Sequence, residues 1–172
     1  MVHKKLKTKY NNLLTIIIPR HIERVNKIET ELKNLGLKIH LHTPKSQIED
    51  NTDIYIVNAY GKTKSFYNNC KNIFLGGSLI KHGGQNPLEA TRYGCNILHG
   101  PYVDNFKEIY NFLKIKKVSR KVNSQKDMIY SLNKFFSRSS NTKKIQKKLN
   151  KIGQNILYKT YNEINSLIKN EA

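Results

Sequence analysis

The 172-residue sequence contains no tryptophan, only two cysteines and four prolines. Cys70 and Cys95 are far apart and fit neither a C-x-x-C motif nor a zinc-ligand spacing, so we expect two reduced packing thiols in a cytosolic protein. No stretch approaches the roughly 18 consecutive apolar residues that a membrane-spanning helix needs. No apolar segment follows the charged residues 1–9 as it would in a signal peptide. The sequence therefore predicts a soluble or peripheral protein.

Acidic residues are too few to balance the basic ones. Lys and Arg number 31 against 12 Asp and Glu, which gives a formal net charge of +19. Such a charge attracts an anionic partner: a nucleic acid, an acidic membrane surface or a phosphorylated small molecule. Hydrophobic residues make up 38% of the chain, which is enough for the packed core of one average domain. The composition excludes wholesale disorder, but charge alone does not choose the partner.

Short apolar runs alternate with amphipathic stretches through most of the chain. The apolar runs predict strands over 13–18, 38–42, 53–57, 72–75 and 97–98. The amphipathic stretches predict helices over 22–35, 63–70, 87–93, 104–113 and 124–136, with Asn86 and Asp104 as N-caps. This alternation indicates an α/β fold: a Rossmann-like parallel sheet with helices on both faces.

A long amphipathic helix is predicted over residues 141–172, separate from a binding domain over residues 1–140. One face of this helix is mostly Lys, Asn and Gln, and the other carries an apolar stripe. We expect the stripe to pack on the domain's own sheet, with docking on a second domain or on an acidic membrane as the alternative. The stripe consists of Ile145, Leu149, Ile152, Ile156, Ile164 and Ile168.

Three loops follow predicted strands, and the carboxyl ends of parallel strands open on one edge of a sheet. In the first loop, Arg20 can grip a phosphate beside the N-terminus of a helix. The second loop is Asn58–Lys62. The third, over 76–89, has four glycines that allow close backbone approach, and the carboxylate of Glu89 suits the hydroxyls of a ribose. Singly, each feature is also explained as a surface charge, a turn or a cap, but together they predict a nucleotide-binding edge.

Other cofactor chemistry is disfavoured. The chain has no G-x-x-x-x-G-K-[ST] motif and no G-x-G-x-x-G after its first strand, which argues against P-loop hydrolysis and NAD binding. His40 and His42 share one strand face and are candidate metal ligands, but no third ligand is apparent, so we expect no metal. His82 and His99 are expected in loops, without a role.

Three segments carry a family resemblance: IIIPRHIER (16–24), FLGGSLIKHGGQNPLEATRYGC (74–95) and HGPYVDNFKEIY (99–110). They resemble the carboxyl-terminal, donor-binding domain of the 3-deoxy-D-manno-octulosonic acid (Kdo) transferases, which are inverting B-type glycosyltransferases. The resemblance extends to near Ser140. It implies an enzyme of lipopolysaccharide biosynthesis that transfers Kdo from CMP-Kdo to a lipid A precursor. It further implies a location on the cytoplasmic face of the inner membrane, on an acidic membrane surface, and no cofactor or metal.

The resemblance also implies the residues that contact the donor. Arg20 and the helix start at Pro87 would hold the phosphate, Glu89 the ribose hydroxyls, and the loop over 60–62 would lie at the cytosine. In place of the family's usual Asp-Thr-Met-Gly-Glu, the chain has Asn58–Lys62, which exchanges two acids for an amide and a cation. The implied donor contacts are Pro19, Arg20, Tyr60, Gly61, Lys62, Asn86, Pro87, Leu88 and Glu89, with His21, Ser78 and Gln85 as further candidates.

The same resemblance implies that parts of the family's enzyme lie outside this sequence. These parts are the amino-terminal domain with its acceptor site and catalytic base, and the first strand of the donor-binding domain. We therefore expect no catalytic base in this chain, no transfer by the chain alone, and a separate amino-terminal half as its partner. The alternatives are a basic nucleic-acid-binding module, suggested by tyrosines among the lysines, and a non-catalytic interaction module. No nucleic-acid-binding motif is present, so we do not expect a nucleic acid partner.

Overall fold

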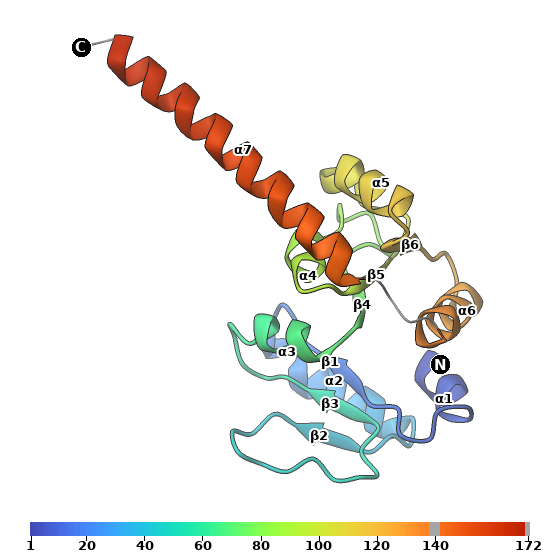
Figure 1. Cartoon of the computed structure of the whole chain (residues 1–172). Helices are drawn as coiled ribbons and strands as arrows, with labels where there is room; N and C mark the ends of the chain where they lie inside the picture. The colour runs from blue at the N-terminus through green and yellow to red at the C-terminus, as the bar shows by residue number, and fades with distance from the viewer. Residues whose placement is uncertain (138–141, 171–172) are drawn as a thin grey trace. The chain divides into compact units, whose positions relative to one another are not determined.

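The computed structural model describes residues 1–137 and 142–170 (Figure 1). The chain divides into two compact units. The first unit comprises residues 1–69 and 124–133, and the second comprises residues 70–123 and 134–172. Each unit is built around its own parallel sheet of three strands.

In the first unit, the strand order is β1 (Thr15–Ile17), β3 (Ile54–Ile56) and β2 (Ile39–Leu41). Successive side chains of a strand point to opposite faces of the sheet. Ile54 and Ile56 pack with Val25, the first residue of α2 (Val25–Asn34), which follows the short turn η1 (Ile22–Arg24). Between them, Tyr55 packs on Phe66 of α3 (Thr63–Asn69), with ring centroids 6.0 Å apart. Helices therefore cover both faces of this sheet, as the sequence predicts.

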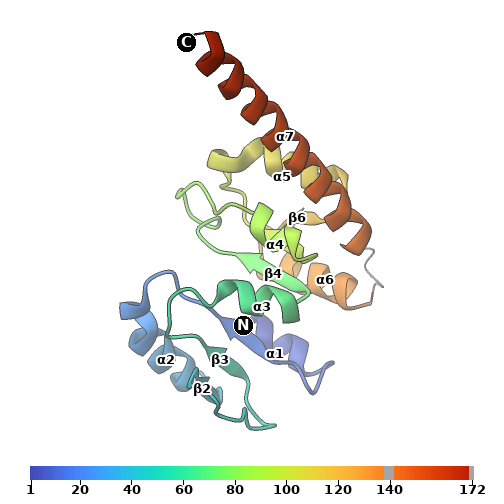
Figure 2. The same ribbon diagram turned by 60° about the vertical axis from the view of Figure 1, so that its left-hand side comes forward.

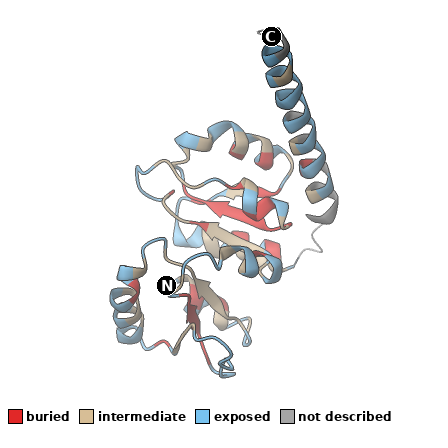
Figure 3. Cartoon of the chain, turned by 90° about the vertical axis from the view of Figure 1, so that its left-hand side faces the viewer, coloured by how far each residue is buried: buried red, intermediate tan, exposed pale blue. Residues whose placement is uncertain are grey.

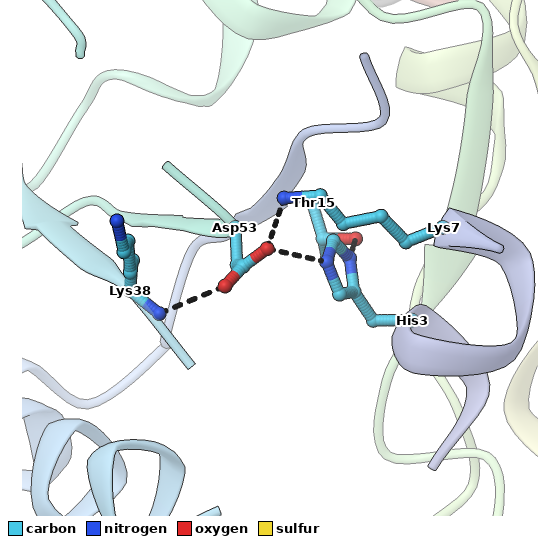
Figure 4. Close-up of polar contacts among 5 residues, drawn as sticks. All are labelled: His3, Lys7, Thr15, Lys38 and Asp53. Atoms are coloured by element: carbon cyan, nitrogen blue, oxygen red, sulfur yellow. Dashed lines mark hydrogen bonds and ion pairs between the residues drawn. The ribbon is translucent and has the colours of Figure 1, made fainter. Parts of the chain in front are cut away.

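The helix α1 (Val2–Lys7) is tied to the amino ends of these strands by the Asp53 carboxylate (Figure 4). One carboxylate oxygen is bonded to the ammonium group of Lys7 and lies 3.4 Å from Nε2 of His3. The other accepts a hydrogen bond of 2.9 Å from the backbone N–H of Lys38, which precedes β2. Nδ1 of His3 lies 2.9 Å from Oγ1 of Thr15, the first residue of β1. This buried cluster holds the end of the sheet opposite to the predicted binding loops.

In the second unit, the strand order is β4 (Asn72–Leu75), β5 (Asn96–His99) and β6 (Ser119–Lys121). All four residues of the central strand β5 are buried. The helices α4 (Leu88–Arg92) and α5 (Lys107–Ile115) follow β4 and β5, and the turn η2 (Asp104–Phe106) leads into α5. The Cys95 thiol donates a hydrogen bond of 3.1 Å to the Cys70 carbonyl. Neither of the two thiols is in a disulfide bond, and burial raises the pKa of both, as expected for packing thiols.

Two helices complete the chain. The helix α6 (Gln125–Phe136) begins after Ser124, whose hydroxyl accepts the N–H of Asp127 at 3.1 Å. The helix α7 (Thr142–Asn170) contacts α4, and Leu149 near its start is buried against Leu113 and Val118 (Figure 2). Its C-terminal half carries exposed apolar side chains, with exposed fractions of 51–71%, at Leu157, Tyr158, Tyr161, Ile164, Leu167 and Ile168 (Figure 3).

The five predicted strands and the parallel α/β architecture are confirmed, but several details are wrong. The expected single sheet is two sheets, because β3 and β5 are each the buried centre of a separate core. The strand β6 was not predicted, since its sequence, Ser-Arg-Lys, has no apolar run. Asp104 does not cap a helix: it is the first residue of η2, and no side chain caps that turn.

The predicted apolar stripe of α7 is only partly packed. Leu149 is buried, as expected, but Ile164 and Ile168 are exposed, because they lie beyond the part of α7 that covers its own unit. The side chains of Ile145, Ile152 and Ile156 lie outside those that the structure describes. So does the expected boundary between residues 140 and 141.

Candidate functional site

Two of the predicted loops leave the same sheet edge in the first unit. The strands β1 and β3 are parallel neighbours in which Ile17 pairs with Ile56, so the segments after them start side by side. Arg20, exposed, follows β1, and the loop over 58–62 follows β3. In that loop Tyr60 is 70% exposed and Gly61 has a positive φ of 74°. The structure thus brings Pro19 and Arg20 to the same edge as Tyr60, Gly61 and Lys62.

The segment after β1 leads directly into the next helix. His21 has an extended backbone (φ −113°, ψ 107°) and precedes η1, whose first N–H groups donate no hydrogen bond to its side chain. Nδ1 of His21 lies 3.3 Å from Oε1 of Glu23, and both side chains are well exposed, so this ion pair is weak. Arg20 therefore lies just before a short turn that has no side-chain cap.

The second unit presents its own edge. Leu75 at the end of β4 pairs with His99 at the end of β5, so the glycine-rich loop over 76–87 starts beside the segment over 100–106. Ser78 joins them and is fully buried. Its hydroxyl donates to the Leu75 carbonyl at 2.6 Å and accepts the Gly100 N–H at 2.8 Å, while its own carbonyl accepts the Tyr102 N–H at 2.9 Å. Ser78 was a candidate ligand contact, but its buried hydroxyl braces the loop instead.

Three glycines make this close approach of backbones possible. A Cβ added at Gly100 would lie 2.1 Å from the Ser78 carbonyl oxygen. At Gly84, with a φ of 73°, it would lie 3.1 Å from the Tyr102 carbonyl oxygen, and at Gly83 it would clash with the side chain of Asn105. Both paired glycines have a positive φ, and Gly84 also packs closely on the backbone of the segment after β5, so the pair does more than form a turn.

The loop ends at the start of α4. The side-chain oxygen of Asn86 accepts the Leu88 N–H at 3.0 Å, but the N-cap of α4 is Pro87, so the prediction of Asn86 as the N-cap is wrong by one residue. The helix spans Leu88–Arg92 and not 87–93, and Pro87 is a buried flanking residue. Because α4 has five residues, its dipole is small, so a phosphate here depends on individual donors more than on the dipole. Asn86 and Glu89 are exposed, Leu88 and Gln85 half-buried.

Two residues behind the loop were missed by sequence reasoning. His99 was expected in a loop but ends β5, where it is buried and its Nδ1–H donates to the Gly100 carbonyl at 2.7 Å. Burial lowers its pKa, and Lys121 and Lys114 lower it further, against the Gly100 hydrogen bond that raises it. Its ring lies 4.3 Å from that of Tyr110, whose hydroxyl donates to the Gln85 carbonyl at 2.8 Å. Both residues lie within the resembling segment 99–110, which is the signal that could have identified them.

The histidine pair considered for a metal has structural partners. The Tyr55 ring is stacked on His40 (5.3 Å between centroids) and meets His42 edge-on (5.8 Å). Nδ1 of His42 lies 2.5 Å from the Tyr55 hydroxyl, and Nε2 of His40 lies 3.0 Å from Oγ of Ser46. Within the described residues, no three His, Cys, Asp or Glu side chains form a group that could hold a metal ion.

The chain is similar in sequence to curated Kdo transferases, although no family model matches it. It is 30% identical to the 3-deoxy-D-manno-octulosonic acid transferase of Haemophilus influenzae over 96% of its own length and 38% of that enzyme. It is 28% identical to the Aquifex aeolicus transferase over 78% of its own length and 36% of that enzyme. The chain thus spans little more than a third of these relatives.

The fold is that of a solved structure. The C-terminal CMP-Kdo binding domain of WaaA from Acinetobacter baumannii superimposes with a TM-score of 0.78, covering 89% of this chain and 80% of that domain at 22% identity. This match confirms the expected α/β fold with parallel strands. Among the described helices, none is both long and apolar enough to cross a membrane.

Proposed function

We propose that this chain, which is related to the Kdo transferases over 96% of its length, binds the nucleotide-activated donor sugar CMP-Kdo. The observation that carries the proposal is the glycine-rich loop over 76–87. Hydrogen bonds to Ser78 and tight packing at Gly83 and Gly84 hold it in one conformation at the carboxyl edge of its sheet. In α/β folds this edge is where nucleotides bind. A preformed loop loses little entropy when a ligand binds.

The donor contacts that we assign are taken from each unit by itself. We assign the phosphate to Arg20, because a guanidinium binds phosphate with two parallel hydrogen bonds. We assign the ribose hydroxyls to Glu89, which is exposed on α4, and the cytosine side to the loop of Tyr60, Gly61 and Lys62. The capped turn of Asn86, Pro87 and Leu88 offers backbone groups to the same ligand.

The test is a calorimetric comparison of nucleotides on the 172-residue chain. We expect CMP to bind at least about tenfold more tightly than UMP or AMP, a difference of about 1.4 kcal/mol. Equal affinity for the three nucleotides would contradict the proposal. Strong, steeply salt-dependent binding of oligonucleotides without a preference for CMP would favour the nucleic-acid alternative instead.

The complete reaction we assign to the chain's family is transfer of Kdo to a lipid A precursor in lipopolysaccharide biosynthesis. An inverting transfer needs a base that takes the proton of the acceptor hydroxyl. We place that base, and the acceptor site, in the part of the relatives that the chain does not span. The chain alone should therefore bind CMP and transfer no Kdo, and robust transfer by the purified chain would overturn this division of roles.

We further propose that the protein works as a peripheral protein on the acidic cytoplasmic face of the inner membrane, where its phosphorylated acceptor lies. Leu157, Tyr161, Ile164 and Ile168 are exposed at the i, i+4, i+7 and i+11 positions of α7 and so share one apolar face. The net charge of +19 favours anionic lipid headgroups.

Vesicle co-sedimentation tests the membrane proposal. Vesicles with anionic phosphatidylglycerol should bind the chain, and neutral phosphatidylcholine vesicles should not. Ile164→Ser with Ile168→Ser should weaken this binding, while Asn162→Ser, at an exposed polar position of the same helix, should leave it unchanged. Equal binding of the chain to anionic and neutral vesicles would contradict the proposal. So would equal binding of the double variant and Asn162→Ser to the anionic vesicles.

A further inference from the structure

Tyr110 connects the body of the second unit to the glycine-rich loop. It lies on α5 and is 2% exposed, yet its hydroxyl reaches the loop and donates a hydrogen bond of 2.8 Å to the Gln85 carbonyl. Hydrogen bonds to Ser78 brace the loop near its beginning, and the Gly84 N–H donates to the Gly77 carbonyl at 3.3 Å within it. The Tyr110 bond acts at its end, one residue before Asn86, whose side chain accepts the Leu88 N–H.

The position of the Gln85 carbonyl determines where the next residues point. This carbonyl belongs to the peptide group that also contains the Asn86 N–H, so holding its oxygen fixes the plane of that group. The Asn86 side chain then accepts the Leu88 N–H at 3.0 Å and sets the start of α4. A single hydroxyl on α5 therefore orients the segment 86–89, which contains half of the residues assigned to the donor.

Tyr110 is itself held from two sides. Its ring lies 4.3 Å from the ring of the buried His99 at the end of β5. Its backbone carbonyl accepts a hydrogen bond of 3.2 Å from the hydroxyl of Ser119, the first residue of β6. The phenol therefore has little freedom, which is what a group that positions a loop requires.

We propose that Tyr110 is a positioning residue of the donor site, and that its hydroxyl holds the turn at Gln85 and Asn86 in the conformation that binds CMP. This proposal rests on the proposed donor-binding function. It predicts that loss of the hydroxyl weakens nucleotide binding although Tyr110 does not touch the nucleotide.

The test compares Tyr110→Phe with Tyr10→Phe. Each variant loses one tyrosine hydroxyl that donates a hydrogen bond, but the Tyr10 hydroxyl donates to the Asn133 side chain, so only Tyr110→Phe loses a bond to the loop. We expect both to lower the melting temperature by a similar amount, and only Tyr110→Phe to weaken CMP binding, by about tenfold. CMP affinity equal to that of the unmodified chain in Tyr110→Phe, or weakened equally in both variants, would overturn the proposal.

Amide hydrogen exchange gives a second reading that needs no ligand. The Leu88 amide is protected by the Asn86 side chain, so it should exchange faster in Tyr110→Phe than in Tyr10→Phe. Equal exchange in the two variants would contradict the positioning role. If the unmodified chain binds no CMP, the proposed function fails on its own, and the exchange result still shows whether Tyr110 holds the turn.

Discussion

The carboxylate of Asp53 and the backbone N–H of Lys38 are joined by a hydrogen bond of 2.9 Å that links the amino ends of two neighbouring strands. The same carboxylate is paired with Lys7 and lies beside His3, so it also anchors α1. Burial raises the pKa of Asp53, but the hydrogen bonds from Lys7, Lys38 and His3 outweigh it and bring the pKa from 3.8 to about 2. The folded state therefore favours the ionised form.

This shift makes the first unit sensitive to acid. Because the pKa of Asp53 is lower in the folded chain, its contribution is complete above about pH 4 and is lost as the pH falls towards 2. A shift of this size corresponds to about 2 kcal/mol. Asp53→Asn should lower the free energy of urea unfolding at pH 7 and flatten its decline between pH 4 and 2, whereas the exposed Asp50→Asn should do neither. An unchanged decline in Asp53→Asn would contradict this account.

Two glycines of the second unit should respond very differently to the same substitution. In Gly100→Ala the new Cβ would lie 2.1 Å from the Ser78 carbonyl oxygen, a backbone atom that cannot move without breaking the brace of the loop. We expect a loss of about 3 kcal/mol or more in the free energy of unfolding. Gly76→Ala has open space around its Cβ and no positive φ, so it should change stability by less than about 0.5 kcal/mol. Thermal unfolding of the pair checks the contrast, and similar melting temperatures would refute it.

Arg20 should act on the phosphate of the donor and on nothing else. Arg20→Ala is expected to weaken binding of CMP by about tenfold to a hundredfold, since a charge-assisted bond contributes about 1.5–3 kcal/mol. Binding of cytidine, which has no phosphate, should not change. Arg24→Ala removes an exposed arginine one turn further on and serves as the matched control for general charge. An equal loss for CMP and cytidine in Arg20→Ala would show that Arg20 does not hold the phosphate.

Glu89 should distinguish a ribose from a deoxyribose. A carboxylate that accepts hydrogen bonds from ribose hydroxyls makes CMP bind more tightly than 2′-deoxy-CMP, and Glu89→Gln should reduce this preference by about tenfold. The comparison uses the ratio of the two affinities, so a general loss of binding does not affect it. If Glu89→Gln prefers CMP over 2′-deoxy-CMP as strongly as the unmodified chain does, Glu89 does not bind the ribose hydroxyls.

Much of this architecture can be predicted from the sequence. Apolar β-branched runs, such as those over 54–56 and 16–18, indicate a strand from the local residues alone. The strand β6 cannot be predicted, because its polar residues are ordered by pairing with β5 and not by their own pattern. The loops of the candidate site were found because they follow strands. The residues that brace the glycine-rich loop, such as Tyr110, were not found. A contact between residues 25 positions apart leaves no signal in the local sequence.

His99 gives the second unit its own response to pH. Burial lowers the pKa of this imidazole below its ordinary value of 6.5, and Lys121 and Lys114 act in the same direction, while the hydrogen bond to Gly100 opposes them. As the pH falls below 6.5, the unfolded chain takes up a proton at His99 more readily than the folded chain does, so the free energy of unfolding falls. His99→Phe keeps a ring against Tyr110 but cannot take up a proton, so it should reduce the loss of stability between pH 7 and 5. His82→Phe, at an exposed histidine of the same unit, should leave that loss unchanged. Urea unfolding at both pH values measures the difference, and an identical pH dependence in His99→Phe and the unmodified chain would show that His99 is not the group responsible.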